Sequence, residues 1–162
     1  MISMDPALTT QLILIFAGAL LGALFGGFAR WTGARNDRRL RLTLDLYTEF
    51  HSPLFNHVRI LAHEALEHSG AMPAAYEAAE GERREAIASI VHFWEKVALL
   101  LRVGALDERL LRRFFGQYAR WWSELLCDRE GALADAEWGA TLRDIQWLFA
   151  RLKRSERTGS RR

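Results

Sequence analysis

The residues best placed to bind a metal ion lie in the stretch His63-Glu64-Ala-Leu-Glu67-His68. Two histidines four residues apart on a helix can bind one zinc ion, with a glutamate between them acting as a base. Here the histidines are five residues apart. That spacing turns about 140° on a helix, so the two rings cannot face one metal. Glu64 and His68 do share a face, as do Glu64 and Ile60, and the sequence favours a solvated helix surface over a metal site.

Nucleophilic side chains lack the partners that catalysis needs. Ser123 has no histidine and aspartate at a spacing that suggests a triad. Cys127 lies near a predicted helix end among charged residues, where it is either a reactive thiol or, as we expect, buried filling. There is no glycine-rich phosphate loop, because the glycines cluster near the N-terminus. We therefore expect no catalytic residue, no metal and no cofactor, and a protein that is not an enzyme.

Aromatic side chains beside arginines are the clearest indication of a ligand or partner. Trp121 and Trp122 point about 100° apart on a helix, so both cannot occupy the centre of one face. One of them could stack on a base or on a protein partner, next to Arg113 or Arg120. The alternative, which we favour, places these aromatics in the core and in a subunit contact.

Helices must position these side chains, since the sequence shows no alternating strand pattern and no hairpin signal. A first helix is predicted from about Asn36 to His51, with Leu40, Leu44 and Tyr47 on one face. Ser52 and Pro53 predict the start of a second helix, or a kink in the first, and the helix should continue to about residue 68. Its inward positions are Leu54, Val58, Leu61 and Ala65. Residues 69–81 indicate a loop with one short helical piece.

The second half of the chain carries stronger helical patterns. A helix over residues 82–103 should end at Gly104. Its buried stripe comprises Ile87, Ile90, Val91, Trp94, Val97, Ala98 and Leu101. Asp107 should cap a helix to about residue 128, with arginines on the wetter side. Its inward positions are Leu111, Phe114, Phe115, Tyr118, Trp122 and Leu125. Asp135 should cap the last helix, whose stripe is Trp138, Leu142, Ile145, Phe149 and Leu152.

An apolar stretch before these helices predicts a membrane anchor. No charged residue lies between Asp5 and Arg30. A helix of about 24 residues is about 36 Å long, which exceeds the roughly 30 Å of a bilayer core. We therefore predict an all-α protein with a single N-terminal transmembrane helix at 8–31. It precedes a cytosolic four- to five-helix up-and-down bundle at 32–154, and a disordered basic tail at 155–162. A cleaved signal peptide fits less well, because no basic residue precedes the stretch.

One half of the predicted membrane helix consists of small residues. They are Gly18, Ala19, Gly22, Ala23, Gly26 and Gly27, whereas leucines and phenylalanines fall on the other half. Small residues four apart allow close backbone contact between membrane helices. We expect this face to mediate self-association, although glycine and alanine are also simply common in membrane helices.

Charge predicts the orientation of the anchor. Residues 30–41 carry five arginines and one aspartate, whereas the seven N-terminal residues carry no lysine or arginine. Positive charge stays on the cytoplasmic side, so residues 1–7 should form a short extracytoplasmic tail and the carboxyl terminus should be cytoplasmic. The residues expected at the membrane surface are Arg30, Trp31, Arg35, Arg38, Arg39 and Arg41.

The charge distribution and cysteine content narrow the class of partner. Residues 42–150 sum to −6 between two basic ends, which favours anionic lipid over duplex nucleic acid. A topology signal followed by a basic tail explains the pattern equally well. The single cysteine allows no intrachain disulfide and suits a reducing compartment.

Two unusual strings carry a resemblance to a known family. They are Gly104-Ala-Leu-Asp107 and Tyr118-Ala-Arg-Trp-Trp122, preceded by Leu46-Tyr-Thr-Glu-Phe-His-Ser-Pro-Leu54. Over roughly residues 40–150 the chain resembles small bacterial proteins of unknown function that pair an N-terminal membrane helix with a cytosolic helical domain. The resemblance implies the fold and an anchor in the bacterial inner membrane. It implies no catalytic or ligand-binding residue.

Two classes of function fit the sequence. The first is a self-associating membrane regulator or effector, whose bundle senses a ligand or partner and acts through the transmembrane helices. A bacterial defence role through membrane perturbation has this organisation, and a nucleotide second messenger or a cytosolic protein is a conceivable trigger. The second class is a constitutive tether or scaffold that holds a cytosolic partner at the bilayer.

Overall fold

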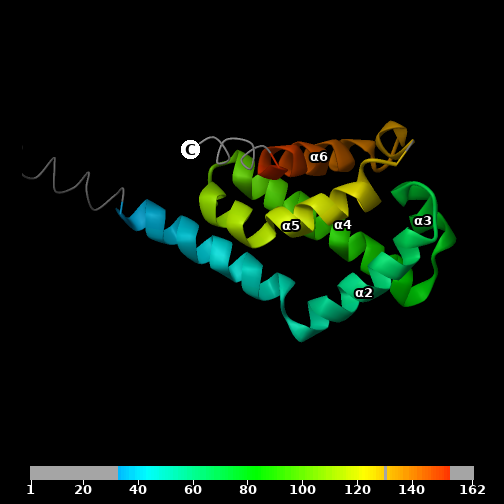
Figure 1. Ribbon diagram of the computed structural model, residues 1–162, viewed down its shortest axis with the longest axis horizontal. Helices are drawn as coiled ribbons and strands as arrows, with labels where there is room; N and C mark the ends of the chain where they lie inside the picture. The colour runs from blue at the N-terminus through cyan, green and yellow to red at the C-terminus, as the bar shows by residue number, and fades with distance from the viewer. Residues whose placement is uncertain (1–32, 130, 154–162) are drawn as a thin grey trace, which may run out of the picture. The chain divides into compact units, whose positions relative to one another are not determined.

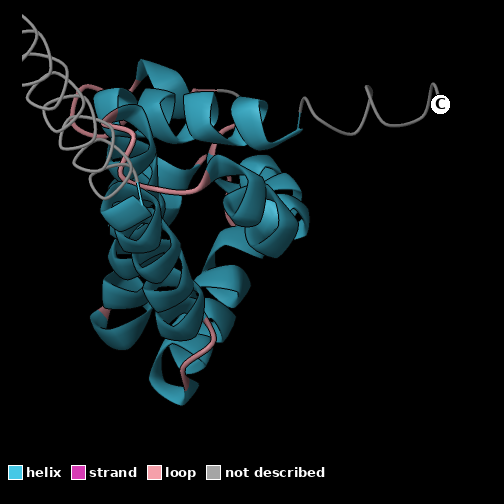
Figure 2. Ribbon diagram, turned by 90° about the vertical axis from the view of Figure 1, so that its left-hand side faces the viewer, coloured by secondary structure: helices cyan, strands magenta, loops and turns pink. Residues whose placement is uncertain are grey.

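The computed structural model describes residues 33–129 and 131–153, and within these ranges every regular element is helical (Figures 1 and 2). A helix over residues 33–50 precedes α2 (Pro53–Glu67), α3 (Met72–Ala78) and α4 (Gly81–Arg102). They are followed by α5 (Glu108–Leu126), the short 3₁₀ helix η1 (Ala132–Ala134) and α6 (Gly139–Lys153). The all-helical prediction is confirmed for this part of the chain, and the short helical piece predicted within residues 69–81 is α3.

The core is built around α4, which packs against both α2 and α6, while α5 packs against α6. Every residue of the stripe predicted on α4 is buried, so the 3.6-residue pattern is confirmed there. Trp94 is fully buried among rings from three other helices. Its ring centroid lies 4.9 Å from that of Phe149, 5.7 Å from Phe50 and 5.9 Å from Phe115. Edge-to-face contacts of this kind add to the free energy gained by burial.

The helix ends follow the predicted capping chemistry. Ser52 Oγ accepts a hydrogen bond from the Phe55 amide at 3.2 Å, with Pro53 at the first helical position. Asp107 Oδ1 accepts from the Leu110 amide at 3.0 Å, and Asp135 Oδ1 accepts from the Trp138 amide at 2.8 Å. Gly104 ends α4 with a φ of +67°, a conformation that glycine adopts without strain.

The apolar face predicted for the 33–50 helix is not the face that the structure buries. Leu40, Leu44 and Tyr47 are each more than a third exposed, and the buried residues are instead Thr43, Leu46 and Phe50. The hydroxyl of Thr43 explains the difference, because it accepts a hydrogen bond from the Asp107 amide at 3.0 Å and donates one to the Arg39 carbonyl at 2.8 Å. A polar residue thus defines the inward face, which a search for apolar residues overlooks.

The inward face predicted for α2 is also partly wrong. Leu54 is 79% exposed, whereas Ala62 and Leu66 are the buried residues of this helix. In the first turn of α2 it is the residue after Leu54, Phe55, that packs on the core, with its ring centroid 5.8 Å from Phe50 and 5.0 Å from Phe93. Val58, Leu61 and Ala65 are half-buried, as neighbours of the buried positions on one helix face.

Several predictions concern residues outside the described ranges. They are the transmembrane helix at 8–31, its small-residue face, Arg30, Trp31 and the tail at 155–162. Across residues 33–129 and 131–153, no helix is both long and apolar enough to cross a bilayer.

Candidate functional site

The exposed side of α5 carries a stripe of arginines. Arg109, Arg113 and Arg120 recur with Gly116 at intervals of four, three and four residues, which places all four positions along one side of the helix. Arg112 lies beside this stripe, and the opposite side of α5 is buried through Leu111, Phe115, Ala119 and Trp122. The amphipathic pattern of α5 therefore sets the direction in which the arginines point.

These arginines line a hollow of about 280 Å³ between α5 and the end of α6. We call it the basic hollow. Its described lining consists of four arginines and one lysine together with one glycine and one leucine: Arg109, Arg112, Arg113, Gly116, Arg120, Leu152 and Lys153. None of these lining residues is acidic, so the hollow can attract anions.

Some of the cations in the basic hollow are engaged by neighbouring carboxylates. Glu108 forms ion pairs with Arg112 and with Arg151, whose Nη2 lies 2.8 Å from Glu108 Oε2. The hydrogen bond from Arg151, assisted by the charge of Arg112, lowers the pKa of Glu108 despite its partial burial. Lys153 Nζ donates to Ser123 Oγ at 2.9 Å and lies 3.9 Å from Asp128 Oδ2. Arg109 and Arg113 form no ion pair with any described carboxylate.

The structure brings together only half of the ligand residues predicted from sequence. Arg113 and Arg120 both line the basic hollow, but Trp121 and Trp122 do not. Trp122 is fully buried, and the partly exposed Trp121 packs on the His63 ring of α2 at 4.5 Å between centroids. The predicted divergence of the two tryptophans is confirmed, and neither is positioned to stack on a ligand beside these arginines.

Sequence reasoning placed Arg109 and Arg112 on the wet side of α5 but did not assign them to a site. The four-three-four spacing around Gly116 was the available signal. Lys153 lies on another helix and more than thirty residues along the chain, so no local pattern could have identified it.

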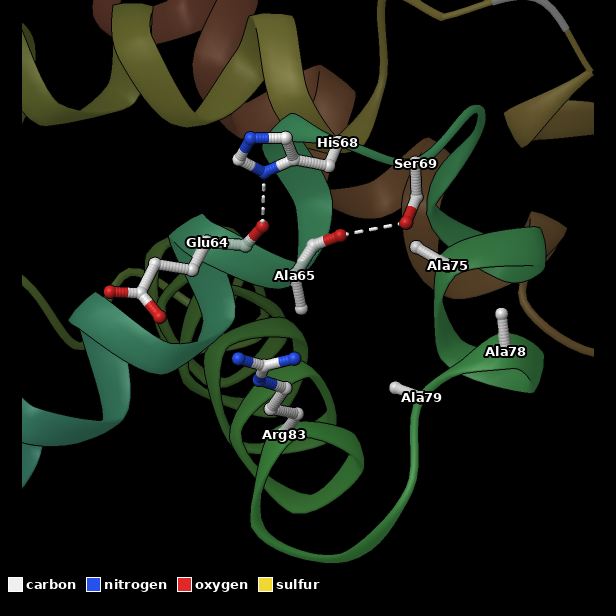
Figure 3. Close-up of a pocket in the computed structure, with 8 residues that line it drawn as sticks. All are labelled: Glu64, Ala65, His68, Ser69, Ala75, Ala78, Ala79 and Arg83. Atoms are coloured by element: carbon white, nitrogen blue, oxygen red, sulfur yellow. Dashed lines mark hydrogen bonds between the residues drawn. The ribbon is translucent and has the colours of Figure 1, made fainter.

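A second hollow, of about 480 Å³, lies among α2, α3 and the start of α4 (Figure 3). Its walls include alanines together with Glu64, His68, Ser69 and Arg83. Glu64 and His68 do share this face, yet His68 Nδ1 lies 3.0 Å from the Glu64 carbonyl oxygen rather than from its carboxylate. Within the described ranges no group of three potential metal ligands occurs.

Arg129 fixes the chain beside this second hollow. Its Nη1 donates to the carbonyl oxygens of Leu66 at 2.5 Å and Gly70 at 2.7 Å, and also to that of Ser69. The Leu66 carbonyl belongs to the last turn of α2, where backbone acceptors have no partner further along the helix, and those of Ser69 and Gly70 follow that turn. The arginine therefore serves as a side-chain cap that joins the end of α5 to the end of α2.

Cys127 is a buried thiol, in agreement with the expectation of filling. Only 3% of the residue is exposed, and its Sγ lies 3.7 Å from the Leu142 carbonyl oxygen. Burial, with a contribution from the charge of Asp128, raises the pKa of Cys127 to about 12. The thiol is thus protonated at neutral pH, and the thiolate needed for nucleophilic chemistry is scarce.

The described residues expected at the membrane surface have two kinds of environment. Arg35, Arg38 and Arg41 are exposed. Arg39 is half-buried, and its Nε donates to the Gly104 carbonyl oxygen at 2.6 Å. The guanidinium of Arg39 therefore contacts the turn between α4 and α5.

Comparisons with known proteins identify a family without an assigned activity. No curated protein and no solved structure matches the chain. The family described as "Domain of unknown function (DUF4760)" matches residues 13–125, a range that extends from the N-terminal apolar stretch to the last turn of α5. The chain therefore belongs to the DUF4760 family.

Proposed function

We propose that this protein is a membrane-anchored, self-associating helical regulator or effector. Its cytosolic bundle senses a ligand or partner and acts through the N-terminal helices. The observation that carries the proposal is the extent of the family match, which begins at residue 13 and includes most of the apolar stretch. Most of the apolar stretch and the bundle as far as α5 are thus matched by one family domain.

The attachment of the 33–50 helix to the bundle favours a regulator over a passive tether. Thr43 bonds to the N-cap of α5, and Arg39 bonds to the turn that precedes it. Leu46 and Phe50 of the same helix are buried in the core. The 33–50 helix, which follows the apolar stretch, is therefore bonded to α5, the helix with most of the arginines described above. A tether would need only a flexible linker between its anchor and its bundle.

The orientation of the proposed anchor is tested with a reporter at the carboxyl terminus. A phosphatase that is active only outside the cytoplasm should remain silent when fused there, because the arginines at 30–41 retain the following residues inside. A fusion to a reporter that works only in the cytoplasm serves as the control and should be active. An active phosphatase fusion would exclude the proposed orientation in the inner membrane.

Self-association is tested by chemical crosslinking in membranes. Gly22→Leu should push paired helices apart and weaken the oligomer, whereas Leu21→Ile on the opposite half should leave it intact. For an effector, toxicity on overexpression should fall with the same Gly22→Leu substitution. A wild-type protein without any oligomer would instead favour the alternative, a constitutive tether or scaffold for a cytosolic partner.

A further inference from the structure

We propose that the basic hollow is a binding site for a phosphate-bearing anion with several negative charges. This inference deepens the proposed function, because it names the class of ligand that the bundle would sense. It rests on three observations about α5 and α6: the spacing of the arginines, the glycine between them, and the absence of aromatic and acidic side chains from the described lining.

The arginines are spaced for an elongated anion. From Arg109 to Arg120 the stripe covers eleven residues, about 16 Å along the helix axis. Guanidinium groups bind phosphate oxygens through paired N–H donors, and phosphates carry more charge than a single carboxylate. Arg109 and Arg113 are exposed and have no described carboxylate as partner, so their donors are available to such a ligand.

Gly116 is the observation that distinguishes a site from a merely solvated basic face. A glycine in the interior of a helix destabilises that helix relative to alanine. Its φ is not positive, and no described atom lies within 4 Å of a Cβ built at this position. Neither backbone conformation nor packing therefore requires glycine here. A side chain at 116 would extend into the basic hollow, and its absence leaves that space open.

The lining also indicates which part of a ligand is recognised. The described walls contain one leucine and no aromatic ring, and Trp121, which follows Arg120 in the sequence, packs on His63 instead. A base would find no platform in this hollow. Recognition should therefore depend on phosphate groups rather than on a nucleobase. The second hollow is a poorer candidate for anions, because the carboxylate of Glu64 lines it.

The test is calorimetric titration of the full-length chain with inorganic tripolyphosphate in a non-ionic detergent. The wild type should bind, with affinity that falls as salt is added. The double variant Arg109→Gln/Arg113→Gln should bind at least about tenfold more weakly, because it loses charge-assisted hydrogen bonds. Arg83→Gln removes one positive charge at the other hollow, and it should bind as the wild type does.

Gly116→Leu is the decisive variant, because it fills the basic hollow without changing any charge. It should fold at least as stably as the wild type, since leucine is the better helix former, and yet bind tripolyphosphate at least about tenfold more weakly. Wild-type affinity in Gly116→Leu, with a circular dichroism spectrum that shows a folded chain, would overturn the proposal. So would the absence of tripolyphosphate binding by the wild type.

Nanodiscs distinguish a soluble phosphate from a lipid headgroup as the source of the ligand. If the hollow engages lipid, phosphatidylglycerol in a phosphatidylcholine disc should compete with tripolyphosphate, and Gly116→Leu should remove that competition. If the ligand is a soluble phosphate, the affinity for tripolyphosphate at high salt should be the same in phosphatidylcholine discs with and without phosphatidylglycerol. Tripolyphosphate binding is measured on the purified chain. A negative result would therefore overturn the anion site alone, whereas the reporter and crosslinking experiments test the membrane orientation and the self-association.

Discussion

Trp94 shows how one residue organises the core, and it supplies the first prediction. Its indole is fully buried, and its Nε1 has no hydrogen-bond partner among the described residues. Trp94→Ala should lower the free energy of unfolding by about 3–5 kcal/mol, because it leaves a cavity among Phe50, Phe115 and Phe149. Trp94→Phe should cost much less, since it keeps a ring and removes the unpaired N–H. Urea unfolding followed by circular dichroism measures both, and equal losses would contradict this account.

Glu108 predicts a pH dependence of stability at the edge of the basic hollow. Its pKa is lowered from the ordinary 4.5, chiefly by the hydrogen bond from Arg151. The Glu108 carboxylate therefore binds a proton more readily in the unfolded chain than in the folded one. The ion pairs stabilise the fold above pH 4.5, and this stabilisation is lost as the pH falls through the pKa that Glu108 has in the folded chain. Wild type should be more stable than Glu108→Gln near neutral pH. The difference in melting temperature should narrow as the pH falls below 4.5, whereas a constant difference would refute the ion-pair explanation.

At the scale of elements, one buried hydroxyl provides the hydrogen bond from the 33–50 helix to the start of α5. Thr43 is fully buried and bonds to the amide of Asp107, the residue that caps α5. Thr43→Val keeps the shape but leaves that amide without an acceptor, at a cost of about 1–3 kcal/mol. Hydrogen exchange at the first turn of α5 should therefore accelerate in Thr43→Val. Thr43→Ser retains the hydroxyl and should protect this turn nearly as well as the wild type does.

The sequence predicted helices well where apolar residues alone decide the buried face. The stripe on α4 is confirmed in full, and those on α5 and α6 are confirmed except at Phe114, Tyr118 and Trp138, which are only half-buried. The 33–50 helix failed the same reasoning, because its inward face is set by Thr43 and by partners distant in sequence. The residues of the basic hollow show the same difference. Arg113 and Arg120 could be predicted because they lie on one helix with a regular spacing. Lys153 could not, because it reaches the basic hollow only through the packing of α6 on α5.

At the scale of the molecule, we predict that residues 36–154 fold without the apolar stretch. The described core connects the 33–50 helix with α2, α4, α5 and α6 through buried residues that all lie after Arg39. Such a fragment should be soluble, show a helical circular dichroism spectrum and melt in one cooperative transition. A fragment with strand signal, or one that melts without cooperativity, would show that the core needs the N-terminal residues.

The burial of Cys127 has a practical consequence for studying the N-terminal residues. The sequence contains this one cysteine, and in the folded chain its protonated thiol is enclosed by the core. Maleimide reagents react with accessible thiolates, so the native protein should remain nearly unlabelled. A cysteine introduced at any one of positions 1–32 would then be the only reactive thiol. Its labelling by permeant and impermeant reagents would test whether these residues enter a bilayer, with the wild-type chain as the unlabelled control.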